Sequence, residues 1–241
     1  MSLSNLRGMI PSWAGAVKAI VRQMVGECEL VRHCRAGDDA VLMQFMLQYY
    51  PFVQVFPECI AGGQRQFRKE LIPVIRRLDE TSAGMFRQVY RSIRDEEREH
   101  HDLWVKDSKT LEIMQSDLER EETQPLISKI IELTSAGAGG PVTWLVRLVG
   151  VEMIAQVFSE LCREDQRFRD AIGQCWFLAH VGHESDDSLT HEQCLFAFAS
   201  AACGKAMRRE TAEAVIVSLT RLFIAVGDSC VATASDAAVY A

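Results

Sequence analysis

The stretch FMLQYYPFVQVFPECIAG, residues 45–62, places its aromatic side chains at the spacing of one helical face. Four of them fall at positions i, i+4, i+7 and i+11 of this stretch: Phe45, Tyr49, Phe52 and Phe56. Residues at these intervals lie on one side of an α-helix, so the stripe is typical of a buried core helix. The same stripe could also form one wall of a substrate pocket.

Helical periodicity recurs along the rest of the chain, whereas sustained period-2 alternation and Asn-Gly or Asp-Gly hairpin turns are absent from the sequence. We therefore predict an all-α bundle of about seven to eight helices. These are expected at about residues 13–35, 38–61, 64–79, 82–107, 122–136, 141–164, 167–200 and 209–233. The expected breaks are Ala36-Gly37-Asp38, Gly62-Gly63, Ser82-Ala83-Gly84 and the SAGAGGP run at 135–141.

The chain length of 241 residues suits one domain, and no linker divides it. We expect a single domain over residues 1–241, with 234–241 as a frayed tail. The formal net charge of −7 argues against nucleic acid as a partner. No uncharged apolar run reaches the roughly 20 residues that a membrane span needs. Eight cysteines without a CxxC pair, and no secretory signal, favour a cytoplasmic protein with reduced thiols.

Five of the six histidines lie in two clusters, and the first cluster is DEEREHHDLW at 95–104. Glu97 lies three residues before His100 and four before His101, so it shares a helical face with either one. Helical bundles use Glu-x-x-His to present a carboxylate and an imidazole to a metal. A charged stretch of this kind is also common on a solvated face. Which of the two histidines would bind a metal stays open.

A second candidate is Glu152, in the apolar stretch WLVRLVGVEMIAQVF at 144–158. Leu145, Leu148 and Val149 share its helical face. Burial of an unpaired carboxylate is costly, so Glu152 should have a hydrogen-bond partner, a proton, a metal or a salt bridge to a neighbouring helix.

The third candidate is the face expected for His180, His183, Asp187 and His191 within one helix. His180 and His191 would lie about 16 Å apart along that helix, too far for both to serve a pair of metals separated by roughly 4 Å. We therefore favour His183, Asp187 and His191, with His180 as an outer partner and Asp186 as a rival of Asp187. Even this shorter span requires a π-bulge or local unwinding near residues 184–190.

The three helices together would offer two glutamates, one aspartate and three histidines. Mixed imidazole and carboxylate ligands suit iron or manganese better than soft thiolate sites do. We predict two Fe(II) ions per chain, with O₂ as co-substrate and coordination positions left open for it. An apolar pocket would protect the oxidising species from water.

The stretches 45–62, 93–104 and 177–191, together with Glu152, resemble the haem-oxygenase-like di-iron oxidases. That group belongs to the wider TenA and pyrroloquinoline-quinone-synthase C fold group. The resemblance implies a haem-oxygenase-like helical domain, with metal ligands at Glu97, His100, Glu152, His183, Asp187 and His191. It further implies a homodimer that oxidises a small amino acid or carboxylate in a biosynthetic pathway, by C–C cleavage or by N- or C-oxygenation.

Two other functions remain open from the sequence. By the same resemblance, the chain could be a metal-free TenA-like hydrolase, with Cys162, Cys175 or Cys194 as its candidate nucleophile. A cofactorless oxidase on the same fold is a related alternative. A non-catalytic helical interaction protein is the other, and it would direct His183, Asp187 and Glu152 toward solvent. The sequence does not identify the substrate.

Overall fold

The computed structural model describes the chain except for residues 1–3, 136–138, 182–188, 205–206 and 240–241. The described residues are almost entirely helical and contain no strand. Helices of the first half are α1 (Ser4–Met9), α2 (Ala14–Gly26), α3 (Glu29–Ala36), α4 (Asp39–Gln66), α5 (Arg68–Arg76), α6 (Glu80–Ser108) and a short 3₁₀ turn, η1 (Lys109–Leu111). Those of the second half are α7 (Gln115–Arg120), α8 (Pro125–Thr134), α9 (Pro141–Arg163), α10 (Gln166–Ala171), α11 (Cys175–His180), α12 (His191–Cys203) and α13 (Arg209–Val239).

The expected all-α class is confirmed, although the helices are more numerous than the periodicity indicates, because several short helices replace longer expected ones. The helix expected over 167–200 is wrong: helix ends fall at Ala171, His180 and Cys203. The expected break at Gly62-Gly63 is also wrong, because α4 continues to Gln66. The break expected at Ser82-Ala83-Gly84 is wrong as well. Helix α6 begins earlier, at Glu80 after its cap Asp79, and continues through these three residues.

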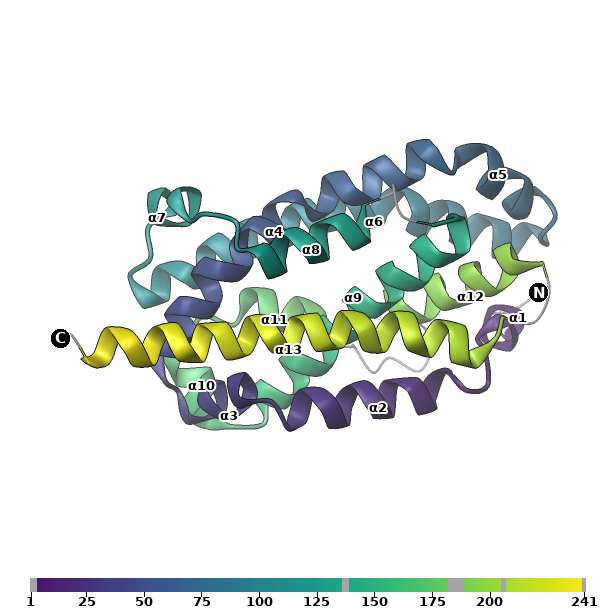
Figure 1. Ribbon diagram of the computed structural model, residues 1–241. Helices are drawn as coiled ribbons and strands as arrows, with labels where there is room; N and C mark the ends of the chain where they lie inside the picture. Colours follow the sequence, from purple (N-terminus) through teal and green to yellow (C-terminus); the bar gives the residue numbers. More distant parts are fainter. Residues whose placement is uncertain (1–3, 136–138, 182–188, 205–206, 240–241) are drawn as a thin grey trace.

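Helix α9 occupies the middle of the bundle, and α13 runs along its full length (Figure 1). Helix α9 packs against α12, α13, α2 and α11, while α6 packs mainly against α4. Helices α11 and α12 each contact both α6 and α9, so they connect the two halves of the bundle. The aromatic stripe of α4 lies in this core, as predicted: Phe45 contacts Trp104, Phe158 and Phe223.

Helix α13 is the one described helix that is long and apolar enough, by length and composition, to cross a membrane. Here it packs against α9, α4 and α3. Ile216, Leu219 and Phe223 are buried on that side of the helix. The segment expected as a frayed tail is helical as far as Val239.

Candidate metal centre

Helix α6 carries Glu97 and His100 toward the centre of the bundle, one helical turn apart. Glu97 is buried, and Nδ1 of His100 donates a hydrogen bond to its Oε1 at 3.1 Å. Burial alone would raise the pKa of Glu97, but the hydrogen bond and the positive charge of His100 outweigh burial and lower it. Burial would lower the pKa of His100, but Glu97 and the nearby Glu96 raise it. Each residue of the pair therefore favours the charged form of the other, carboxylate for Glu97 and imidazolium for His100.

The neighbouring His101 points elsewhere. Its Nε2 lies 3.1 Å from the hydroxyl of Tyr50, and its Nδ1 lies 3.3 Å from Oδ1 of Asp102. Of the two adjacent histidines, His100 is therefore the one that faces Glu97.

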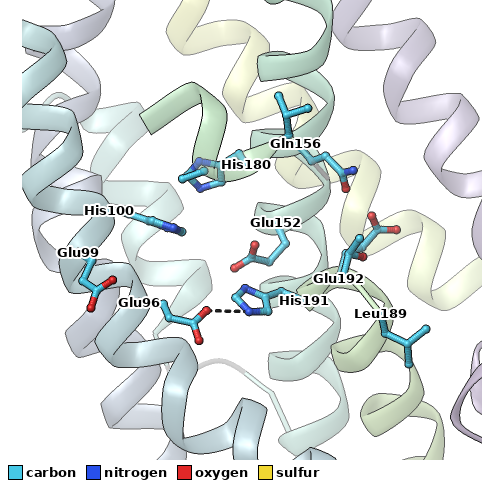
Figure 2. A pocket seen from close by; sticks show the side chains of 12 residues that line it. Glu96, Glu99, His100, Glu152, Gln156, His180, Leu189, His191 and Glu192 are labelled. Carbon is cyan, nitrogen blue, oxygen red and sulfur yellow. Dashed lines mark ion pairs between the residues drawn. The ribbon is translucent and has the colours of Figure 1, made fainter. Parts of the chain in front are cut away.

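Glu152 extends from α9 into the same region, as Figure 2 shows. The side chain is buried, and its Oε1 has no hydrogen-bond partner among the described residues. Burial raises the pKa of Glu152 well above its usual value, and the negative charge of Glu97 raises it further. A buried polar atom without a partner normally costs about 1–3 kcal/mol, so a cation bound to Oε1 of Glu152 would offset this cost.

His180, the last residue of α11, completes the buried group. Its Nδ1 donates to the carbonyl oxygen of Trp176 at 2.8 Å, which fixes the tautomer and leaves Nε2 with a free lone pair. Burial, followed by the charge of His100, lowers the pKa of His180 to about 4, so the ring is neutral near pH 7. Neutral imidazole is the form that binds a metal.

Glu97, His100 and His180 each offer one ligand atom, and these atoms all lie within 4.8 Å of one another. The structure thus places His180 beside Glu97 and His100. The prediction of one continuous helix had instead made His180 an outer partner of His183, Asp187 and His191. The reason is the end of α11 at His180: the ring no longer lies on one straight helix with His191.

His191 lies at the start of α12, where Thr190 caps the helix through a capping box with Gln193. Its Nε2 lies 2.7 Å from Oε2 of Glu96 (Figure 2). The expected ligands His183 and Asp187, and the rival Asp186, lie outside the described residues. Leu189 and Thr190, which flank them, are not helical.

Two cavities meet at Glu152 and His180. The larger, of about 260 Å³, is lined by Glu96, Glu99, His100, His191 and Glu192 among others. The smaller, of about 30 Å³, is lined mostly by apolar side chains, including Tyr49, Phe52 and Phe56 of the α4 stripe. The four candidate ligands Glu97, His100, Glu152 and His180 therefore lie where a polar chamber meets a small apolar one.

Sequence reasoning missed the polar wall of the larger cavity. Glu192 is buried and lies 2.9 Å from Nζ of Lys18, which also donates to Gln156 at 2.8 Å. Nothing in the sequence pairs residues 18 and 192, because only the tertiary fold brings α2 beside α12. Glu96 was detectable: it precedes His100 by four residues and so shares its side of α6.

No protein-family model matches the sequence, and a search of curated proteins gives no match. Solved structures do match it. A TenA homologue from Pseudomonas syringae pv. tomato str. DC3000 has a TM-score of 0.69 at 15% identity, over 92% of this chain and 93% of that one. The chain has the TenA-type helical fold.

Two further structures with the TenA-type fold support this assignment. A protein from Silicibacter sp. TM1040, described as a TenA family transcription regulator, has a TM-score of 0.59 at 11% identity, over 95% of this chain and 96% of that one. A TenA homologue from P. horikoshii OT3 has a TM-score of 0.53 at 13% identity, over 89% of this chain and 94% of that one. Structural similarity at sequence identities this low shows the fold of the chain alone. Its activity has to be argued from the residues of the site.

The TenA-type fold does not bring a cysteine to this site. None of the described residues that line the two cavities is a cysteine. Cys162 and Cys194 are buried, and burial raises the pKa of both thiols, which disfavours the nucleophilic thiolate. Cys175 is half-buried at the start of α11, and its backbone N–H donates to Asp107.

Proposed function

We propose that the chain is a non-haem di-iron oxidase or oxygenase, which uses O₂ to oxidise a small amino-acid or carboxylate substrate. The observation that carries the proposal is Glu152: a buried carboxyl group without a partner for Oε1, beside Glu97, His100 and a neutral His180. Carboxylates and imidazoles in this mixture suit iron better than softer metals.

The donors fall into two groups that would each serve one iron. Glu97, His100 and His180 would hold the first. Figure 2 shows Glu152 between His180 and His191. His191 and Glu96 would belong to the second, together with His183 and Asp187 from the adjoining segment. When bound, ferrous iron supplies the electrons that reduce O₂, which no side chain of the cavity can do.

The protein's own groups would prepare this site by giving up protons. The raised pKa of Glu152 favours its protonated form, and the neighbouring Glu97 raises the pKa of His100 and so favours its imidazolium form. Both must lose a proton before they coordinate a cation, so iron uptake should release protons to solvent. His180 needs no such change, since its Nδ1–H is already committed to Trp176.

The cavities favour a small substrate. A chamber of about 260 Å³ is below the range of about 300–1,000 Å³ usual for drug-sized ligands. Its wall includes Glu99 and Gln156, polar groups that suit a substrate amino group. The adjoining apolar chamber, walled by Tyr49 and Phe52, would exclude water from the reacting atoms.

The test is an anaerobic titration of the purified protein with Fe(II), followed by addition of O₂ and observation of its visible absorption. We expect about two irons per chain and new absorption bands after O₂ is added. His100→Gln should weaken iron binding by more than the about 10–100-fold cost of losing an outer partner. His101→Gln is the matched control, because the adjacent ring faces Tyr50, and it should bind iron as the wild type does.

Two results would contradict the proposal. One is a folded protein that takes up no iron. The other is an equal loss of iron binding in His100→Gln and His101→Gln, which would mean that the buried group around Glu97 is not the binding site.

A further inference from the structure

A separate cavity on the other side of α6 is lined mainly by arginine. It has a volume of about 700 Å³ and lies between the end of α4, helix α5 and the first half of α6. Six arginines contribute to its lining: Arg65, Arg68, Arg76, Arg87, Arg91 and Arg94. We call this cavity the arginine groove.

Most of these arginines lack an acidic partner. Arg94 pairs with Asp95 at 2.8 Å, but the other five have no ion pair with any of the described residues. Elsewhere the protein does pair its arginines: Arg22 contacts Glu160 and Arg98 contacts Glu58. Like charges gathered in one place repel, so a cluster of unpaired guanidinium groups favours the binding of an anion.

The arginine groove is distinct from the candidate metal centre. Arg91 precedes His100 by nine residues, which is about 180° around a helix that turns by about 100° per residue. The two residues therefore lie on opposite sides of α6. An anion in the groove would not contact the metal ligands proposed above.

The composition of the groove points to an anion with an organic part. Guanidinium groups bind phosphate through two parallel N–H donors. Ile72 and Tyr90 also line the groove, and they supply apolar and aromatic surface beside the arginines. A volume of about 700 Å³ lies within the usual range of about 300–1,000 Å³ for small-molecule sites.

The arrangement of the charges indicates more than one phosphate group. Arg87 and Arg94 are seven residues apart on α6, which is about 10.5 Å of helix. Arg68 and Arg76 are eight residues apart along α5, about 12 Å. A single phosphate could contact only part of a row this long.

The charge of the rest of the molecule argues against a long polyanion. The chain carries −7 in total, while the groove contributes six arginines and one aspartate, so the remainder carries −12. A nucleic acid that extended beyond the groove would meet this negative surface. We propose that the arginine groove binds a small organic polyphosphate, of the class of nucleoside di- and triphosphates.

The test uses calorimetry on the full chain with ATP and with inorganic triphosphate, in buffer with EDTA so that no metal bridges a ligand to the carboxylates. We expect ATP to bind, and Arg87→Gln/Arg91→Gln to weaken it by at least tenfold. Arg120→Gln/Arg221→Gln is the control: both residues are exposed and outside the groove, and the double change removes the same charge. It should bind ATP within about twofold of the wild type.

The four substituted arginines are exposed, so both variants should keep the wild-type melting temperature and iron uptake. No binding of ATP at millimolar concentration would overturn the proposal, as would equal weakening in both double variants. Binding of a single-stranded oligonucleotide in place of ATP would overturn it in favour of a nucleic-acid surface. Triphosphate binding as tightly as ATP would overturn the role of the organic part.

Discussion

Glu152 is a buried carboxyl group whose polar atoms are incompletely satisfied. It is buried beside a second carboxylate, Glu97, and its Oε1 has no hydrogen-bond partner among the described residues. Without a cation, such a group destabilises the fold at neutral pH, because either it stays protonated or two negative charges share a site of low dielectric. With a cation, the same group becomes a ligand.

Replacement of Glu152 by glutamine should therefore stabilise the metal-free protein near pH 7. The pKa of Glu152 is raised in the folded state, so its contribution to stability is fully present in acid and is lost as the pH rises above about 4.3, the usual value for an unfolded chain. Glu152→Gln should abolish this loss and raise the free energy of unfolding by about 1–3 kcal/mol at pH 8. Urea denaturation at pH 5 and pH 8, with metal removed, measures both.

The exposed residue Glu122 supplies the control, since Glu122→Gln makes the same substitution in a loop and should change stability little. A Glu152→Gln protein that is less stable than the wild type at pH 8 would mean that Glu152 is already well satisfied.

Residue chemistry was predictable where it depended on local context. A glutamate in an apolar helix marks Glu152 from the sequence alone, and helical spacing marks Glu97 with His100 or His101. Only the structure shows that His100 is the one that faces Glu97. The role of His180 was not predictable in this way, because it depends on where one helix ends. The Lys18–Glu192 pair was not predictable either, since it joins residues that only the fold brings together.

At the scale of elements, helix α11 owes its position to a residue of α6. Asp107, buried near the end of α6, accepts hydrogen bonds from the backbone N–H groups of Cys175 and Trp176 at 2.9 and 2.8 Å. It thus caps α11 from a neighbouring helix. The backbones are close: a Cβ atom added at Gly173 would lie 2.5 Å from Oδ1 of Asp107. This contact holds α11, and therefore His180, beside Glu97 and His100.

Asp107→Ala should weaken metal binding through His180, although Asp107 touches no candidate ligand. We expect a loss of about 10–100-fold in affinity for Fe(II), the usual effect of losing a residue that orients a ligand. Loss of the cap should also cost about 0.5–2 kcal/mol of stability. The control is Asp38→Ala, which removes the cap of α4 and should lower stability without affecting the metal. If both variants bind Fe(II) equally, Asp107 has only a structural role.

Helix ends were predictable where a local capping residue determined them and no contact with another helix was involved. Gly37, with φ of 69°, ends α3, and Asp38 caps α4, as the Ala36-Gly37-Asp38 break predicts. The predicted break at Gly62-Gly63 was wrong, because Gly63 serves the packing of α4 against another helix and does not end α4. Gly63 faces Trp144 of α9, and a Cβ atom there would overlap the indole ring.

The two adjacent glycines should respond to alanine in opposite ways. Gly62 has open space around a Cβ atom, so Gly62→Ala should gain up to about 1 kcal/mol from helix propensity. Gly63→Ala gains the same propensity but must displace the rigid Trp144 ring, and it should destabilise by about 1–3 kcal/mol. Thermal denaturation of both variants measures the difference. Equal effects would contradict the close approach of α4 and α9.

At the scale of the whole molecule, the candidate site is the point where separate helices meet. Helix α6 supplies Glu97 and His100, α9 supplies Glu152, α11 ends at His180, and α12 begins at His191. The bundle class followed from periodicity, but this convergence did not, because periodicity says which face of a helix is buried and not which helices meet. A cation at this point would link four separate helices, α6, α9, α11 and α12.

Removal of the metal should therefore lower the stability of the entire bundle. At a free Fe(II) concentration of about 100 times the dissociation constant, binding stabilises by about 2.7 kcal/mol. For a chain of this size, about 2–4 °C per kcal/mol implies a rise in melting temperature of roughly 5–11 °C. Anaerobic calorimetry with Fe(II), and again after a chelator, measures the shift.

The rise in melting temperature caused by Fe(II) should be smaller at acid pH, because His100 must lose its proton before it can bind a metal, and the pKa of His100 is raised. Glu152→Gln should reduce the shift, whereas Arg87→Gln/Arg91→Gln should retain it; a full shift in Glu152→Gln would place the metal elsewhere.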